Sequence, residues 1–398
     1  MSIIEKWSKQ TFLYHFRNLR SMPQFNVKDA KSHESSYERK VNELEEELST
    51  TKYNKKTQGH IGLVKAKLAK LKEEYQRKAA SKGKGEGFSV RRTGDATVII
   101  VGFPSVGKST LLNAITNANS PVGSYAFTTL TCIPGLLEYN NAKIQVLDVP
   151  GIVEGAATGR GRGKEVLACA QSADLVIILL DVFNPEHLDV VKKEIYETGL
   201  RVNQKPPQVN ISRKIRGGID IGLTVKLTKM SEETIKSILK EFRLDNCSIV
   251  IREDITDDQL IDVIEGNKRY IPAITVLNKI DMVKNEELDR IKSIVKPDVS
   301  ISAENKLNTQ YLKELIFRKL NFIRVYCKEI GKKADMGVPL IIRKGNTLRD
   351  VCSKLHKDFI SKFRFARIWG KSVKFDGMIL RKLEHVVQDN DIVEIHLN

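Results

Sequence analysis

The residue types that phosphate chemistry requires stand together in one short stretch of this 398-residue chain. An apolar run over 98–101 predicts a short buried strand. The residues that follow it are Gly102, Phe103, Pro104, Ser105, Val106, Gly107, Lys108, Ser109 and Thr110. These residues fit the pattern G-x-x-x-x-G-K-[ST], which predicts a loop that wraps the phosphates of a nucleotide and then enters a helix.

Each fixed position of this pattern has a physical role. A loop that points successive backbone N–H groups at phosphates leaves no room for side chains at Gly102 and Gly107, or forces dihedrals there that favour glycine. Lys108 would bring its ammonium to the β- and γ-phosphates, and Ser109 would offer its hydroxyl to Mg²⁺. We therefore expect a nucleotide with Mg²⁺ as the ligand of this loop.

Two further segments would complete the site around the terminal phosphate. Asp148 and Gly151 stand in the sequence D-x-x-G at the end of an apolar run. Asp148 would hold Mg²⁺ through water, and the Gly151 amide would contact the γ-phosphate. Phe127, Thr128 and Thr129 open a threonine-rich run between the phosphate loop and Asp148. One of its hydroxyls would complete the Mg²⁺ shell, although threonine is also common in ordinary strands.

A third region predicts which base the site would accept. Asn278, Lys279 and Asp281 follow another apolar run. An Asp281 carboxylate would accept hydrogen bonds from the N1–H and 2-amino groups of guanine, whereas adenine would leave it unpaired. Asn278 would tie this loop to the phosphate loop, and Lys279 would lie along the base. A later loop would place backbone amides near the guanine O6, and its residues are Ser302, Ala303 and Glu304. The pattern favours GTP over ATP.

The composition narrows the partners and the compartment. Lysine and arginine outnumber acidic residues by 66 to 49, which gives a net charge of +17. This excess favours a ribosome or RNA as partner, and charge that only maintains solubility is the alternative. The five cysteines form no C-x-x-C pair, and no apolar run is long enough to span a membrane. We expect a cytoplasmic monomer with reduced thiols and no membrane partner.

The order of predicted strands and helices divides the chain into several parts. Residues 94–336 alternate apolar strands with helical stretches and predict an α/β domain with a parallel sheet. A small α+β subdomain is inserted in it at about 201–266. Residues 36–88 predict a helical hairpin with a linker, and 338–398 predict a ubiquitin-like β-grasp unit. Residues 1–35 are an extension to which the pattern assigns no fold.

The second helix of the predicted hairpin has a lysine-rich face. Its cationic residues are Lys65, Lys67, Lys70 and Lys72. A face that docks on RNA or a ribosome and an ordinary solvated helix face both fit this pattern.

Together these residues resemble the Obg-related GTPases, most closely their developmentally regulated GTP-binding branch. The matching segments are 59–72, 102–110, 127–131, 148–151, 154–165, 278–281 and 302–304. The C-terminal unit is similar to the TGS domain of that branch. The resemblance therefore implies a P-loop GTPase core with a helical N-terminal domain, an inserted domain and a TGS domain.

The resemblance also implies an activity and partners. It implies magnesium-dependent GTP hydrolysis in which Lys108, Thr129 and Gly151 act at the γ-phosphate. Ser109, Thr129 and Asp148 would hold Mg²⁺. A role in translation through ribosomes follows from the same likeness, and a regulatory protein partner is a further candidate.

One position departs from the best-known hydrolytic arrangement. Ile152 follows Gly151, where Ras-type GTPases carry the glutamine that orients the attacking water. We therefore expect slow hydrolysis by the protein alone, with a partner or K⁺ as candidate sources of the missing charge. K⁺-activated relatives usually carry Asn at the position of Ser105. Arg160 and Arg162 are candidate arginine fingers.

Two other functions stay open at this point. One is a GTPase whose partner is a protein and whose positive charge is incidental, for which binding would depend weakly on salt. The other is a metabolic P-loop ATPase or kinase, which would bind ATP and GTP similarly and tolerate Asp281→Asn.

Overall fold

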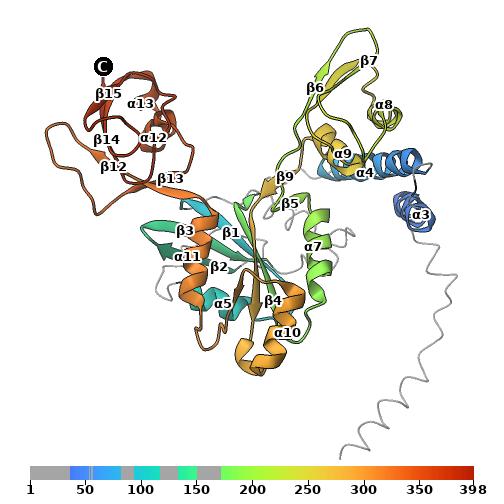
Figure 1. Ribbon diagram of the computed structural model, residues 1–398, viewed down its shortest axis with the longest axis horizontal. Coiled ribbons are helices and arrows are strands. Elements are labelled where there is room, and N and C mark those ends of the chain that lie inside the picture. The colour runs from blue at the N-terminus through green and yellow to red at the C-terminus, as the bar shows by residue number, and fades with distance from the viewer. Residues whose placement is uncertain (1–35, 53, 55–56, 82–93, 117–132, 150–171) are drawn as a thin grey trace, which may run out of the picture. The chain divides into compact units, whose positions relative to one another are not determined.

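The structure is a computed structural model in which residues 36–52, 54, 57–81, 94–116, 133–149 and 172–398 are described (Figure 1). The chain forms two compact units. One contains the N-terminal helices together with residues 207–266. The other contains the rest of the chain from residue 86 onward. Each unit is described separately below.

A six-stranded sheet with the order β11-β10-β4-β1-β3-β2 forms the centre of the second unit. Its strands are β1 (Ala96–Val101), β2 (Ile133–Tyr139), β3 (Ala142–Asp148), β4 (Leu175–Asp181), β10 (Ala273–Asn278) and β11 (Val299–Ser300). All neighbours are parallel except β2, which pairs antiparallel with β3. Apolar runs at 97–101, 144–148, 175–180 and 273–277 predict strands, and these runs form β1, β3, β4 and β10, so the predicted α/β core is confirmed. Because the loops after parallel strands meet at one edge, this sheet can assemble a site there.

Helices cover both faces of this sheet (Figure 1). They are α5 (Lys108–Ile115), α7 (His187–Glu197), α10 (Asn285–Val295) and α11 (Thr309–Lys319). α7 and α10 pack on one face, and α5 and α11 pack on the other. β1 and β4 are buried along their whole length, which explains why their sequences are continuous apolar runs and do not alternate.

The short parallel pair β5 (Leu200–Val202) and β9 (Arg269–Ile271) lies where the chain leaves this domain and returns to it. The inserted residues form a three-stranded sheet with the order β6-β8-β7 and two helices. These elements are β6 (Val209–Arg213), β7 (Ile219–Leu223), α8 (Glu232–Glu241), β8 (Cys247–Ile251) and α9 (Asp257–Glu265). They share one apolar core in which Ile235, Ile249 and Leu260 are completely buried.

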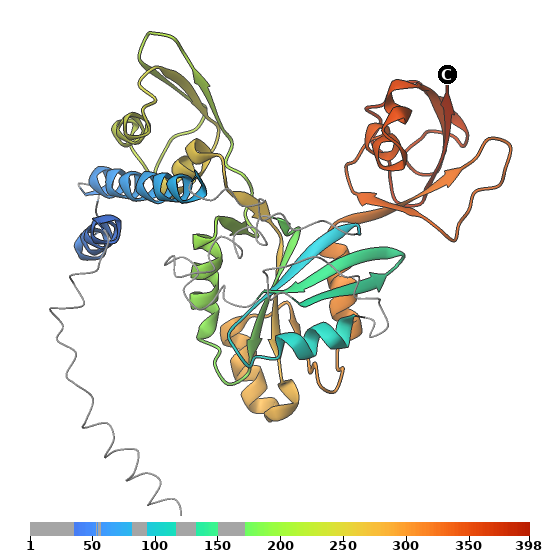
Figure 2. The same ribbon diagram turned by 180° about the vertical axis from the view of Figure 1, so that it is seen from behind.

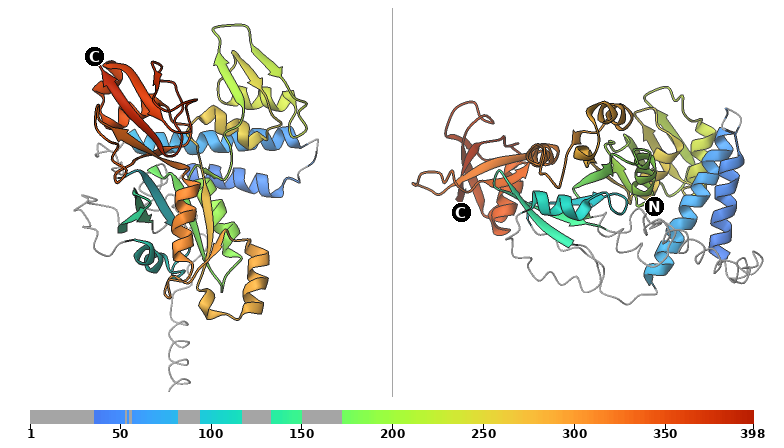
Figure 3. Two further views of the ribbon diagram at one scale, coloured as in Figure 1. Left: turned by 60° about the vertical axis from the view of Figure 1, so that its left-hand side comes forward. Right: turned by 90° about the horizontal axis from the view of Figure 1, so that it is seen from below.

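The N-terminal helices α3 (Ser36–Thr50) and α4 (Gln58–Ser81) form the predicted hairpin (Figure 3). His60 of α4 contacts Glu47 of α3, and Lys72 contacts Glu45. α4 also belongs to the core of the inserted residues, because Ala66 is completely buried there. The hairpin and the insert, which are far apart in sequence, are therefore one packed body.

The lysine-rich face of α4 is used largely inside this body. Lys65 Nζ lies 3.1 Å from Asp257 and 2.8 Å from Asp258, and Lys70 Nζ lies 3.1 Å from Glu241. Acidic residues of α8 and α9 thus neutralise this part of the face. Lys67 is exposed. Lys65 and Lys70 are therefore paired within the body, although the sequence placed both on an outer face.

The C-terminal residues form a five-stranded sheet with the order β13-β12-β16-β14-β15 (Figure 2). Its strands are β12 (Phe322–Lys328), β13 (Leu340–Arg343), β14 (Phe363–Trp369), β15 (Met378–Leu380) and β16 (Asp391–Leu397), with helices α12 (Leu348–Leu355) and α13 (Asp358–Ser361). A capping box of Thr347 and Asp350 begins α12. β12 is the second strand of this sheet, although the sequence placed its residues at the end of the preceding domain.

None of the helices in the described ranges is long and apolar enough to cross a membrane. Cys247, Cys327 and Cys352, the cysteines in those ranges, are free thiols.

Glu394 holds one face of the C-terminal sheet together. Its side chain is 3% exposed and lies 2.8 Å from both Lys328 Nζ and His396 Nε2. Burial disfavours the charged carboxylate, but the hydrogen bonds from Lys328 and His396 outweigh it and lower the pKa of Glu394. Such a group stabilises the fold above its unfolded-state pKa, and the stabilisation is lost as the pH falls through the lower folded-state pKa.

We expect Glu394→Gln to destabilise the C-terminal sheet at pH 7 and to flatten the loss of its stability on acidification. Trp369 reports on this region, because Lys328 Nζ lies 4.2 Å from the centre of its ring. The measurement is urea unfolding of a Trp7→Phe background, followed by tryptophan fluorescence at pH 7 and at lower pH. Glu384→Gln is the control, because its pair with Arg349 is exposed. Equal effects of the two substitutions would contradict the role of Glu394.

Candidate nucleotide site

The predicted phosphate loop lies between β1 and α5, at the carboxyl edge of the central sheet. Gly107 has a φ of +96°, and a Cβ atom there would lie 2.5 Å from Asn278 Nδ2. A Cβ atom at Gly102 would lie 2.4 Å from the carbonyl oxygen of Leu179. Both glycines are therefore required by backbone conformation or close approach before any ligand is considered.

The Lys108 ammonium is hydrogen-bonded to carbonyl groups of the loop itself. Its Nζ donates to the carbonyl oxygens of Gly102 at 3.1 Å and Phe103 at 3.0 Å. Val106 is buried, whereas Pro104 and Ser105 are exposed. Thr110 follows in the first turn of α5 and is half-buried. The loop thus holds a cation at the N-terminal end of α5, as an anion site requires.

Ser109 and Asp148 lie together beside this loop. The Ser109 hydroxyl donates to Asp148 Oδ2 at 3.0 Å. The other carboxylate oxygen, Oδ1, is buried and has no hydrogen-bond partner among the described residues. A buried unpaired carboxylate oxygen is costly unless water or a cation satisfies it. The pair therefore fits a hydrated metal ion.

Asn278 connects three loops of the site. Its side chain is buried, and its Nδ2 donates to the Val106 carbonyl at 2.9 Å. Its Oδ1 accepts from the Ala303 backbone N–H at 3.0 Å. Ser302 and Ala303 are buried, and Glu304 is exposed. The structure thus brings together the phosphate loop, the loop after β10 and the loop after β11, as the sequence proposed.

Lys279 follows Asn278 and is held by several partners. Its Nζ donates to the Ser105 carbonyl at 2.7 Å and lies 3.3 Å from Asp181 Oδ2. The centre of the Phe183 ring is 5.6 Å from the same Nζ. Asp281 lies in the short helix η3 (Ile280–Met282) and is exposed. The Lys279 side chain is therefore fixed between the phosphate loop at Ser105 and the end of β4 at Asp181.

Asp181 is a site residue that the motifs did not identify. It ends β4 in register with Asn278 at the end of β10. Its Oδ1 accepts from the backbone N–H groups of Phe183 and Asn184, both at 3.2 Å. The signal in the sequence was the apolar run 175–180, which ends at Asp181. The other motifs also follow apolar runs, so Asp181 could have been placed at the same sheet edge.

A second contact joins the same turn to the phosphate loop. The rings of Phe103 and His187 stack with centres 3.9 Å apart and planes inclined by 26°. His187 is the first residue of α7. The turn from Asp181 to His187 therefore contacts the base side of the site through Lys279 and its phosphate side through Phe103.

Some proposed site residues lie outside the described ranges. They are Phe127, Thr128, Thr129 and Gly151, together with Ile152, Arg160 and Arg162.

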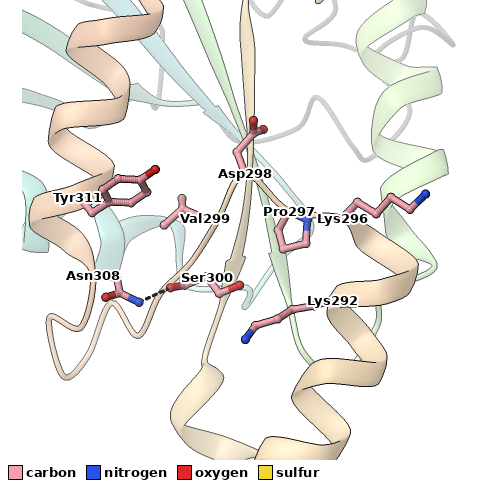
Figure 4. A pocket seen from close by; sticks show the side chains of 8 residues that line it. All are labelled: Lys292, Lys296, Pro297, Asp298, Val299, Ser300, Asn308 and Tyr311. Carbon is pink, nitrogen blue, oxygen red and sulfur yellow. Dashed lines mark hydrogen bonds between the residues drawn. The ribbon is translucent and has the colours of Figure 1, made fainter.

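A pocket of about 460 Å³ lies beside the edge strand β11 (Figure 4). The residues that line it are Lys292, Lys296, Pro297, Asp298, Val299, Ser300, Asn308 and Tyr311. Asn308 Nδ2 donates to the Ser300 carbonyl at 2.8 Å within it. Since neither the phosphate loop nor residues 278–281 line this pocket, it is separate from the nucleotide site.

We expect Asp181→Asn to weaken the binding of guanine nucleotides roughly tenfold, the cost of one charge-assisted hydrogen bond. The amide oxygen would still accept from Phe183 and Asn184, but it would no longer pair with the charge of Lys279. The measurement is the affinity for a fluorescent GDP, with Asp189→Asn, an exposed residue of α7, as the control. Wild-type affinity in Asp181→Asn would exclude the proposed role.

Comparison with known families agrees with this arrangement. Residues 97–214 match a family described as 50S ribosome-binding GTPase. Residues 216–322 match the C-terminal region of the MMR_HSR1 domain, and residues 323–397 match the TGS domain. Among solved structures, the Schizosaccharomyces pombe YchF GTPase aligns with 77% of this chain and 99% of that chain, with a TM-score of 0.41 and 16% identity.

Full-length relatives are more similar. An uncharacterized GTP-binding protein of Methanocaldococcus jannaschii is 52% identical over 362 residues, which cover 90% of this chain and 92% of that protein. Human developmentally-regulated GTP-binding protein 2 is 43% identical over 359 residues, which cover 89% of this chain and 98% of that protein. This chain combines a P-loop GTPase domain with a C-terminal TGS domain. The chain therefore belongs to the developmentally regulated GTP-binding protein family.

Proposed function

We propose that this GTPase is a slow molecular switch of the Obg-related group that acts with ribosomes or RNA during translation in the cytoplasm. The observation that supports the switch is a pair of hydrogen bonds at Asn278, whose Nδ2 donates to the Val106 carbonyl and whose Oδ1 accepts from the Ala303 backbone N–H. They hold the phosphate-binding and base-binding loops in one arrangement before any nucleotide is considered. A rigid site of this kind leaves the segments that contact the γ-phosphate as the parts that respond to it.

Mg²⁺ is the metal that the site fits. Within the described ranges, no group of three or more His, Cys, Asp or Glu side chains is placed to hold a metal ion by itself. Ser109 and Asp148 would hold it together with phosphate oxygens and, in the triphosphate state, Thr129. When bound, the ion would neutralise charge on the β- and γ-phosphates.

The residues of the chain itself would mainly position the nucleotide. Lys108 would exchange its contacts with the loop carbonyls for contacts with phosphate oxygens. Lys279 and Asp281 would fix the base. We propose that hydrolysis is slow because Ile152 cannot orient water, and that Ser105 makes K⁺ dependence weak.

The switch itself would lie in two segments outside the described ranges. Residues 127–131 and 151–164 would be ordered by GTP through Thr129 and the Gly151 amide, and released by hydrolysis. Since the rest of the site is already held in place, the difference between the two nucleotide states would be concentrated in these segments.

Charge and family support the ribosome as the partner. The net charge of +17 favours a polyanion, and the matching family is described as ribosome-binding. A protein partner is the second candidate, and the internal ion pairs of Lys65 and Lys70 favour it, because they remove part of the expected RNA-binding surface. The two partners differ in how strongly salt would weaken binding.

The test is co-sedimentation of the full chain with ribosomes at several salt concentrations. GDP would be compared with a non-hydrolysable GTP analogue, and an ATP analogue would serve as the nucleotide control. We expect stronger binding with the GTP analogue and a steep loss of binding as salt rises. Absent or nucleotide-independent binding would leave the GTPase in place but contradict the ribosome role.

A further inference from the structure

The hairpin formed by β14 and β15 concentrates positive charge on the C-terminal domain. Residues 364–382 contain six cations and one acid. The cations are Arg364, Arg367, Lys371, Lys374, Arg381 and Lys382, and the acid is Asp376. All six cationic residues are exposed. The hairpin therefore has a strong excess of exposed positive charge.

The loop at the end of this hairpin also exposes an aromatic ring. Phe375 is 64% exposed, and Ile379 of β15 is 49% exposed. Among the described residues, no other ring and no cation stacks on Phe375. A single exposed apolar side chain is common, but a bare ring next to a lysine in a cation-rich hairpin is the combination that single-stranded nucleic acids bind.

Three hydrogen bonds hold the loop in its conformation. Asp391 is completely buried, and its Oδ1 accepts from the Ser372 backbone N–H at 3.3 Å. Asp376 Oδ1 accepts from the Gly370 N–H at 3.2 Å, and the Gly377 N–H donates to the Ile368 carbonyl at 2.9 Å. Phe375 is thus presented by an anchored loop, which lowers the entropy cost of binding.

Two acidic residues that interact with cations of the hairpin are already paired with other cations. Asp389, which interacts electrostatically with Lys371, receives two hydrogen bonds from the Arg324 guanidinium at 3.2 and 2.9 Å. Glu394 is buried, and Arg367 Nη1 lies 4.0 Å from its carboxylate. Lys371 and Lys374, the two lysines of the loop, form no ion pair with an acid in the described ranges, so the loop attracts a polyanion.

We propose that this hairpin binds single-stranded RNA, with an unpaired base stacked on Phe375 and neighbouring phosphates on Lys371 and Lys374. The proposal names the contact surface for the RNA partner in the proposed function and rests on it. A single strand is specified because a ring can stack only on a base whose face is free, which paired bases in a helix do not offer.

The experiment measures binding of the full chain to a fluorescein-labelled unpaired RNA of about 12 nucleotides, within the usual site size of such surfaces. The variants are Phe375→Leu, Phe375→Tyr and the double substitution Lys371→Glu with Lys374→Glu. The matched charge control is Lys236→Glu with Lys240→Glu, because both lysines are exposed on α8.

We expect Phe375→Leu to weaken RNA binding about fivefold or more, because it removes the ring but keeps an apolar side chain. Phe375→Tyr should retain wild-type affinity. The Lys371 and Lys374 reversals should weaken binding further and reduce the salt slope by about 0.7 for each phosphate that the variant no longer neutralises. The α8 reversals should have a much smaller effect.

Two results would overturn the proposal. One is no binding of the RNA by the wild-type chain even at low salt. The other is wild-type affinity in Phe375→Leu together with equal effects of the two lysine pairs. Either result would leave the ribosome role to be judged by co-sedimentation. Loss of ribosome binding in the Lys371 and Lys374 variant, without RNA binding by the wild type, would instead indicate a protein contact.

Discussion

The buried side chain of Asn278 is the constraint on which the nucleotide site depends. One amide group donates to the phosphate loop at Val106 and accepts from the loop after β11 at Ala303. Glycine at position 107 follows from this contact, because a Cβ atom there would lie only 2.5 Å from the Asn278 amide nitrogen. The parallel strands bring all three loops to one edge, and the amide then fixes their spacing. Phosphate binding and base recognition are therefore parts of one structure.

A second feature is the way in which the chain uses its charges. Lysines of α4 form ion pairs with acidic residues of α8 and α9. In the C-terminal sheet, Glu394 is paired with Lys328 and His396. Net charge alone therefore overstates the basic surface that a partner could meet. The cations of the β14–β15 hairpin differ, because all six are exposed and Asp389 and Glu394 are paired with Arg324 and Lys328.

The sequence predicted those features that depend on local pattern. β1, β3, β4 and β10 were predictable because strands buried on both faces are continuous apolar runs. β2 was not, because it contains Pro134 and Gly135, and a Cβ atom at Gly135 would lie 2.6 Å from Thr116 Cγ2 of the packed helix end. Asp181 was missed because its role comes from its register with Asn278, which lies far along the chain. The packing of α4 on the insert likewise depends on a long-range contact that helical periodicity does not encode.

The most direct test of the account is calorimetric titration of the full chain with GDP, IDP and ADP. IDP lacks only the 2-amino group of guanine. ADP lacks both the N1–H and the 2-amino group, from which Asp281 would accept hydrogen bonds. We predict that GDP binds most tightly, IDP about tenfold more weakly and ADP at least about a hundredfold more weakly, because unpaired polar groups then remain in the site. Similar affinities for GDP and ADP would contradict the assignment of Asn278, Lys279 and Asp281 to base recognition.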